Sequence, residues 1–281
     1  MIIDSHCHAW ETWPYSQRVP DPDSRGRVEQ LLYEMDLNGV DRALVVSAQI
    51  DHNPENNAYV AECVERYPDR LVQVADLDSS WSRTYRTAGA DERLRTMVAQ
   101  WPIAGFTHYL AKDDDGGWLT GADGRALFRE AASRRLLASV SCYPHQQESI
   151  RRLADAFPAV PILCHHLGHP RASDREPQDG LKEILATARC RNVSIKVSGF
   201  SYASESTWDF PFSDVRRIVG ALYEHFGPDR LLWGSDYPVV RGRMTYRQSI
   251  EVVRSHCDFI PPADRTSILG PSLERLLAGL R

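Results

Sequence analysis

No apolar run in the 281-residue sequence reaches the roughly 18 to 20 residues that a membrane-spanning helix needs. The first residues have the pattern of a strand, without the basic and then apolar segments of a leader peptide. The formal net charge is -5, and no long block of one sign occurs, which argues against nucleic-acid binding. We therefore expect a soluble, cytoplasmic protein that acts on a small molecule and binds neither membranes nor nucleic acid.

Two further motifs are missing. A glycine-rich G-x-G-x-x-G turn does not follow the first predicted strand, which argues against a dinucleotide-binding sheet. The cysteines form no C-x-x-C pair and are widely scattered, so we predict free and mostly buried thiols. These are Cys7, Cys63, Cys142, Cys164, Cys190 and Cys257.

Apolar strands alternate with amphipathic helical segments along most of the chain. After an irregular segment over 9–27, predicted to be a loop, strand follows helix repeatedly, and the count of strands is eight. Such alternation predicts a parallel sheet covered by helices, and eight units in this length favour a closed (β/α)8 TIM barrel. We expect one domain over 1–281, with closing helices from residue 250 onward. The predicted strands are 2–8, 43–46, 71–75, 103–109, 136–142, 160–166, 192–197 and 231–236.

The segment Asp4-Ser5-His6-Cys7-His8 lies at the carboxyl end of the first strand. Because successive side chains in a strand alternate between its faces, His6 and His8 should point one way and Cys7 the other. Two histidines alone are more often unrelated to a site. Two imidazoles on one face could nevertheless supply half of a metal site.

Other polar residues collect where the remaining strands end, which is where barrel enzymes build active sites. Six of the ten histidines fall at such positions. Alternation also implies that only one of His165 and His166 points inward. We predict that Lys196 pairs with a buried carboxylate and that Cys142 is core packing. The strand-end residues are His6, His8, Thr107, His108, Cys142, Tyr143, His165, His166, His169, Lys196, Ser198 and Asp236.

Two chemistries suit such a set. His6, His8, one histidine of the sixth strand and Asp236 could hold one Zn²⁺, whose bound water has a pKa of about 7. Without a metal, Asp236 could act as general base on water while histidines polarise a substrate carbonyl. The residues alone leave both open.

Four motifs in order along the chain resemble the amidohydrolase superfamily, in particular its amidohydrolase-related (amidohydrolase 2) branch, which includes lactonases and zinc decarboxylases. They are Met1-Ile-Ile-Asp-Ser-His-Cys-His8, His166-Leu-Gly-His-Pro170, Val193-Ser-Ile-Lys-Val-Ser-Gly199 and Trp233-Gly-Ser-Asp-Tyr-Pro238.

The resemblance implies roles for particular residues. It assigns His6, His8, His166 and Asp236 as metal ligands, with His166 preferred over His165 and Asp236 handling the proton of the attacking water. It leaves open whether one divalent metal or none is required. The Gly105-Phe106-Thr107-His108 stretch lacks the arginine of lactonases that act on carboxylated rings. The Ser141-Cys142-Tyr143 region replaces the histidine of two-metal members.

We expect a hydrolase that opens the ester of a sugar-acid or aromatic-degradation lactone, with Asp236 and His166 catalytic. Trp10, Thr107, His108 and Tyr143 are the predicted substrate contacts. The alternative is a zinc-dependent non-oxidative decarboxylase of an aromatic or related acid. A barrel that only binds a ligand would lack part of the four-residue set, and none is missing. Assembly into homo-oligomers is left open.

Overall fold

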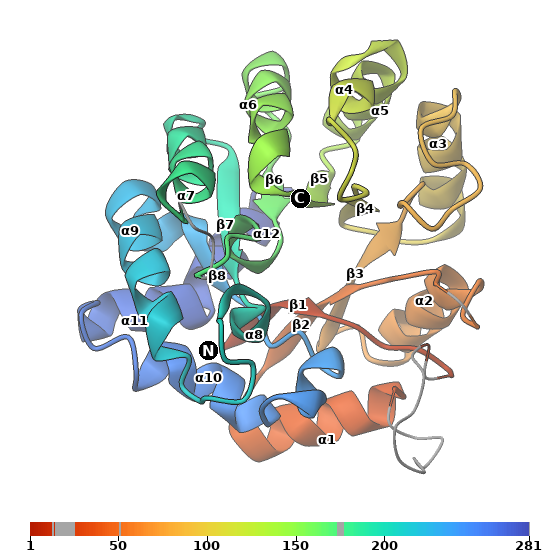
Figure 1. The fold of residues 1–281 in the computed structure, drawn as a ribbon. Coiled ribbons are helices and arrows are strands. Elements are labelled where there is room, and N and C mark those ends of the chain that lie inside the picture. The colour runs from red at the N-terminus through yellow and green to blue at the C-terminus, as the bar shows by residue number, and fades with distance from the viewer. Residues whose placement is uncertain (13, 15–25, 51, 173–176, 281) are drawn as a thin grey trace.

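The computed structural model describes the chain except residues 13, 15–25, 51, 173–176 and 281, and the side chains of 177–179. The loop predicted over 9–27 therefore lies largely outside the described residues. Eight parallel strands follow one another in chain order, β1 to β8, and a ring of helices surrounds them (Figure 1). This confirms the predicted TIM barrel. The strands are β1 Ile3–Cys7, β2 Arg42–Val46, β3 Leu71–Asp76, β4 Gly105–Tyr109, β5 Leu137–Ser141, β6 Ile162–Cys164, β7 Val193–Val197 and β8 Leu231–Trp233.

The helices lie between the strands and after the last one, as the apolar periodicity predicted. The helix predicted at 212–226 begins instead at Arg216, after a 3-10 turn over Ser213–Val215. Among the described residues, none of the helices combines the length and apolar character needed to cross a bilayer. The helices are α1 Val28–Asn38, α2 Asn56–Arg66, α3 Ala90–Gln100, α4 Gly117–Thr120, α5 Ala122–Ser133, α6 Gln147–Ala156, α7 Pro177–Ala186, α8 Phe200–Ala203, α9 Arg216–Phe226, α10 Tyr246–Arg254, α11 Pro262–Leu269 and α12 Pro271–Ala278.

The core has two parts, because each strand buries both of its faces. A large cluster fills the space between the sheet and the helices, and it includes all six cysteines, which are free and buried as predicted. A smaller cluster lies inside the barrel at its amino end, where α12 packs onto the strands. Its buried members are Ile3, Leu44, Val74, Leu137, Leu163, Leu232, Leu273 and Leu277. This smaller apolar cluster closes the amino end of the barrel, so polar residues lie at the carboxyl end.

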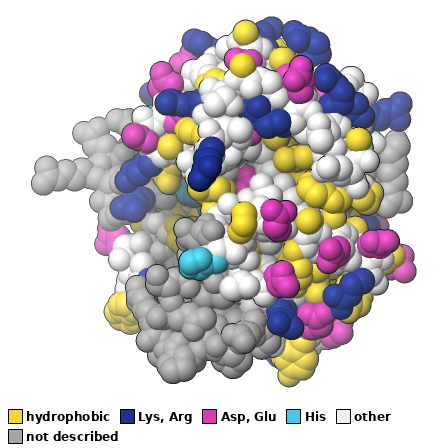
Figure 2. Space-filling view, turned by 90° about the vertical axis from the view of Figure 1, so that its right-hand side faces the viewer, with side chains coloured by type: hydrophobic (Ala, Val, Ile, Leu, Met, Phe, Trp, Pro, Cys, Tyr) yellow, Lys and Arg dark blue, Asp and Glu magenta, His cyan; other side chains and the backbone are white. Residues whose placement is uncertain are grey.

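On the surface, acidic and basic side chains are interspersed (Figure 2), in keeping with the scattered charges of the sequence. Neither acidic nor basic side chains alone cover the face shown. This agrees with the prediction drawn from charge patterning, although it tests no partner.

The barrel closes where β1 meets the chain that follows β8. His8 N donates to Tyr237 O (2.9 Å) and Asp236 N donates to His6 O (3.0 Å), and Cys7 forms a bridge to Tyr237. These bonds tie the histidine-bearing end of β1 directly to Asp236. Residues at opposite ends of the sequence therefore become neighbours.

Strands β6 and β8 are shorter than predicted. They end at Cys164 and Trp233, whereas the apolar pattern suggested continuation to His166 and Asp236. His166 (φ 47°) and Asp236 (φ 57°) adopt left-handed backbone conformations that a strand cannot contain. Both functional candidates thus sit on sharp turns just past their strands, and sequence periodicity carries no signal for such turns.

Candidate active site

A bulge in β1 aims its two histidines into the barrel mouth. The register of β1 against β2 shifts between Asp4 and Cys7. Ile3 belongs to the inner cluster, and strict alternation from it would also point Cys7 inward. Instead Cys7 packs in the outer cluster, while His6 Nε2 and His8 Nε2 lie 3.1 Å apart. The prediction that both histidines share a face and Cys7 opposes them is confirmed, and the bulge explains why the histidines take the inner face.

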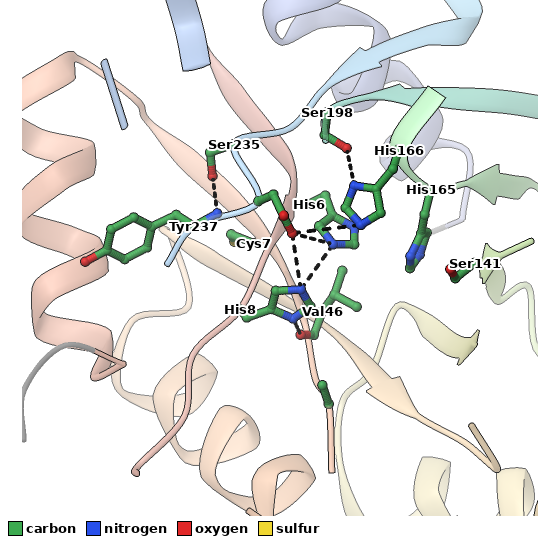
Figure 3. A network of polar contacts seen from close by, with 12 residues as sticks. His6, Cys7, His8, Val46, Ser141, His165, His166, Ser198, Ser235 and Tyr237 are labelled. Carbon is green, nitrogen blue, oxygen red and sulfur yellow. Dashed lines mark hydrogen bonds and ion pairs between the residues drawn. The ribbon is translucent and has the colours of Figure 1, made fainter. Parts of the chain in front are cut away.

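Asp236 lies at the centre of the polar cluster. Its Oδ1 is 3.5 Å from His6 Nε2, 3.7 Å from His8 Nε2 and 3.9 Å from His166 Nε2. Its other oxygen, Oδ2, accepts a hydrogen bond from the hydroxyl of Tyr202 in α8. Figure 3 shows the rings of His6, His8 and His166 turned toward one another. The four residues singled out from the sequence are therefore brought together at one point.

His165 joins the same cluster. Its ring centroid lies 4.5 Å from that of His6, and His166 lies 4.7 Å from His6 on another side (Figure 3). The expectation that only one of the two adjacent histidines points inward is wrong. Alternation applies within a strand, and both residues follow the last residue of β6, Cys164, where the backbone turns.

Burial keeps the imidazoles neutral. Desolvation holds the pKa of His6 and of His166 well below the usual value, and it lowers the pKa of His8 to about 4. The same desolvation raises the pKa of Asp236 to about 7, although the hydrogen bond from Tyr202 opposes it. A carboxylate with such a pKa can take up and release a proton near neutrality.

Hydrogen bonds to residues behind the cluster fix the orientation of its side chains. His8 Nδ1 bonds to Val46 O, and His166 Nδ1 lies 3.0 Å from Ser198 Oγ. Asp4, a buried carboxylate that sequence reasoning did not single out, accepts from His6 N (2.9 Å) and Ser235 Oγ (2.6 Å). Its one visible signal was a carboxylate two residues before His6 in the same strand. It links β1 to the residue preceding Asp236.

Lys196 is fully buried on β7 beneath His6. Its Nζ lies 2.9 Å from His6 Nδ1 and 2.7 Å from Ser139 Oγ. The ion pairs of the described residues do not include Lys196, so the prediction of a carboxylate partner is wrong. Desolvation lowers its pKa to about 7, while Asp4 and Asp236, at longer range, oppose that shift.

The four predicted substrate contacts occupy different places. Trp10 is buried and stacks on His8, with ring centroids 4.9 Å apart. Thr107 is buried, and its hydroxyl makes no hydrogen bond within the described part of the chain. His108 points out of the barrel, between Tyr85 and Trp118, and its Nδ1 donates to Leu77 O (3.0 Å). At the end of β4 it is instead Tyr109 whose ring lies against His165, at 4.9 Å.

Tyr143 lines a cavity of about 500 Å³ beside the cluster. His169 forms the wall between them, because its ring lies 4.9 Å from Tyr143 and 5.2 Å from His166. Lys112 and Arg171 bring positive charge to the rim. The cavity has room for a small ring compound, and His169 separates it from His166.

The cluster could hold a metal ion. Two overlapping groups of potential ligands share His6, one with His8 and Asp236 and one with His165 and His166. Ligand atoms about 2.0 Å from a tetrahedral zinc lie about 3.3 Å apart, close to the 3.1 to 3.7 Å found among His6, His8 and Asp236. His8 also bonds a carbonyl through its other nitrogen, as metal-bound histidines do. His6 Nε2 also lies at a suitable distance for a ligand, but His6 Nδ1 contacts the amine of Lys196 and not a carbonyl.

Barrel enzymes carry their active sites at the carboxyl ends of the strands, and here β1, β6 and β8 bring histidines and an aspartate to that end. The amidohydrolase family model matches residues 3–272, so the chain belongs to the amidohydrolase 2 family. This family assignment agrees with the resemblance found in the four motifs.

Individual relatives are distant. The chain is 26% identical over 240 residues to a 4-sulfomuconolactone hydrolase of Rhizobium radiobacter, covering 84% of this chain and 75% of that protein. It is 25% identical over 212 residues to an L-fucono-1,5-lactonase of Burkholderia multivorans, covering 66% and 67%. An amidohydrolase from Burkholderia multivorans solved with bound zinc shares the fold, with a TM-score of 0.79, 20% identity and 99% of each chain covered.

Proposed function

We propose that this enzyme hydrolyses the ester bond of a lactone. The observation that carries the proposal is the position of Asp236, whose Oδ1 faces three neutral imidazoles within 3.9 Å beside a cavity that fits a small ring. The two distant relatives named lactone hydrolases support the same reaction. A sugar-acid lactone and an aromatic-degradation lactone are both compatible with this site.

In the proposed reaction Asp236 Oδ1 takes a proton from water as the water oxygen attacks the lactone carbonyl carbon. Imidazole N–H groups of the cluster stabilise the negative oxygen of the tetrahedral intermediate. The bond from that carbon to the ring oxygen then breaks, and the proton held by Asp236 passes to the leaving oxygen. The product is the open hydroxy acid.

One divalent ion such as Zn²⁺ would be held by His6, His8, His166 and Asp236. When bound, it would supply Lewis-acid polarisation of the carbonyl and lower the pKa of a water molecule. The relative solved with zinc supports this arrangement, and the buried Asp236 supports a reaction without it. Metal analysis of protein purified without chelator, paired with activity after chelation, separates the two.

A lactone panel in weakly buffered indicator tests the proposal. Acid release that follows lactone consumption supports hydrolysis. The competing candidate is a zinc-dependent non-oxidative decarboxylase, in which the same ligand set would bind a carboxylated substrate. Release of carbon dioxide from aromatic acids, with no lactone consumed, would replace our proposal with that one.

The activity of the metal-free enzyme should depend on one ionisation near pH 7. Asp236 must be a carboxylate to accept a proton, and burial raises its pKa to about 7. Below that pH we expect kcat/KM to fall about tenfold per pH unit, and above it to level off. The His8 imidazole, with a pKa of about 4, stays neutral throughout. A profile that is flat from about pH 5 to pH 8 would contradict this role.

The rim of the cavity favours a lactone that carries an anionic group. Lys112 and Arg171 line it, whereas its one described carboxylate, Glu183, is bound by Arg151 at 2.7 Å. Lys112 and Arg171 therefore supply positive charge at positions other than that of the arginine missing from β4.

We expect Lys112→Met and Arg171→Met each to raise KM for a carboxylated lactone by about tenfold, the loss of one charge-assisted hydrogen bond. For a neutral lactone of the same ring size, KM should change little. Lys182→Met, which removes an exposed lysine of α7, is the matched control. Equal effects on both lactones would exclude an anion contact.

A further inference from the structure

The hydrogen bonds around His6 reveal which of its nitrogens carries the proton. His8 Nδ1 contacts the carbonyl of Val46, which can only accept, so His8 Nδ1 must donate and His8 Nε2 keeps its lone pair. His6 Nε2 lies 3.1 Å from that lone pair. Two neutral nitrogens at this distance attract only if one bears a proton. The proton therefore sits on His6 Nε2, and His6 Nδ1 is an acceptor.

Lys196 donates the hydrogen bond that His6 Nδ1 accepts. Its Nζ is 2.9 Å from His6 Nδ1, and an amine offers N–H groups in either protonation state. The position of Nζ is fixed from the other side by Ser139 Oγ, at 2.7 Å, which in turn lies 2.6 Å from His165 Nε2. Ser139 accepts from Lys196 and can donate its single hydrogen to His165. Along the chain His165–Ser139–Lys196–His6–His8–Val46, Lys196 donates in both directions, to Ser139 and to His6, and the bonds from His6 to Val46 all run away from it.

We propose that Lys196 is a positioning residue that holds His6 in its Nε2–H tautomer, so that His6 is a poor metal ligand and its N–H group, shared with His8 Nε2 in the free site, is available to the reacting oxygen. This deepens the proposed lactone hydrolysis and rests on it for the identity of that oxygen. The tautomer assignment itself follows from the contacts alone.

The Nε2–H tautomer of His6 affects the binding of any cation at this site. A ligand nitrogen must offer a lone pair, so an ion at His6 Nε2 requires the proton to move to Nδ1. There it would face Lys196, whereas metal-bound histidines normally face a carbonyl or carboxylate. Lys196 therefore disfavours the full four-ligand site that the distances alone would permit.

Lys196→Met tests this, because methionine has similar length and no N–H group. In metal-free protein labelled with ¹⁵N-histidine, long-range ¹H–¹⁵N spectra report the tautomer, and His6→Gln assigns the signals. We expect His6 to be the Nε2–H form in the natural protein and a mixture in Lys196→Met. Zinc affinity, measured by competition with a chromogenic chelator, should rise about tenfold in the variant. Lys182→Met should match the natural protein in both measurements.

Neither measurement uses a substrate, so their outcome is independent of whether lactones are hydrolysed. An Nδ1–H form of His6 in the natural protein would overturn the proposal, and that spectrum decides even where the variant does not fold. An Nε2–H form that persists unchanged in Lys196→Met, or zinc affinity that stays equal or falls, would also overturn it. Lys196→Gln, which restores an N–H donor, should recover the natural tautomer and zinc affinity.

Discussion

Asp236→Asn should lower lactone hydrolysis by about 10²- to 10⁴-fold while the protein remains folded. The amide has nearly the same shape as the carboxylate and can still accept from Tyr202 through its oxygen. It cannot take a proton from water. The loss should appear in kcat and not in KM, since Asp236 is not among the residues that line the cavity. Steady-state kinetics on the best lactone of the panel measure this.

The same variant should be more stable than the natural protein at pH 8. The pKa of Asp236 is raised to about 7 in the folded state, against 3.8 for the ordinary group. The folded protein therefore binds this proton more tightly than the unfolded chain, and folding stability falls as pH rises from about 4 to about 7. Asparagine removes that cost, so the melting temperatures of the metal-free proteins should differ at pH 8 and converge below about pH 4.

A matched control lies near the other end of the same strand. Asp229, paired with Arg275 on the surface just before β8, can also be changed to asparagine. We expect Asp229→Asn to leave turnover unchanged. Near-normal turnover in Asp236→Asn, or an equal loss in both variants, would refute the role assigned to Asp236.

The fold could be predicted because its signals are local. Apolar runs and helical periodicity lie within ten or so residues, and each strand of the barrel was located to within two residues at its start. The four residues predicted as the centre of the site are also brought together by the fold, and strand ends and family motifs are what marked them. Strand ends and family motifs can both be read from the order of residues, without knowing which way a side chain points.

What could not be predicted depends on turns and on contacts across the barrel. His108 was expected in the site but points outward, because Gly105, Thr107 and Tyr109 take the inner face of β4. His165 was discounted, yet the turn after Cys164 brings it inward. The partner of Lys196 lies 190 residues away in sequence. Distances between strands β1, β5 and β7 decide such pairs, and no local pattern records them.

Gly234→Ala should reduce turnover by about 10²-fold or more, although the residue touches no substrate. A Cβ at this position would lie 2.8 Å from His6 Cβ and 3.2 Å from His6 N. Real Cβ atoms do not approach so closely, so the seam between β8 and β1 has to open. His6 and Asp236 would separate, because Asp236 N donates to His6 O across that seam. Misplacement by about 1 Å is enough to cost this much rate.

The variant also should lose about 1 to 3 kcal/mol of unfolding free energy, as small-to-large changes in packed regions do. Gly242→Ala is the control, since a Cβ there meets no atom within 4 Å and the residue lies in the same loop after β8, in the 3-10 helix Val239–Gly242. Urea unfolding and kinetics on both variants check the prediction. Full activity in Gly234→Ala would mean that the β1–β8 seam tolerates widening, and that the precise approach of His6 to Asp236 does not limit the reaction.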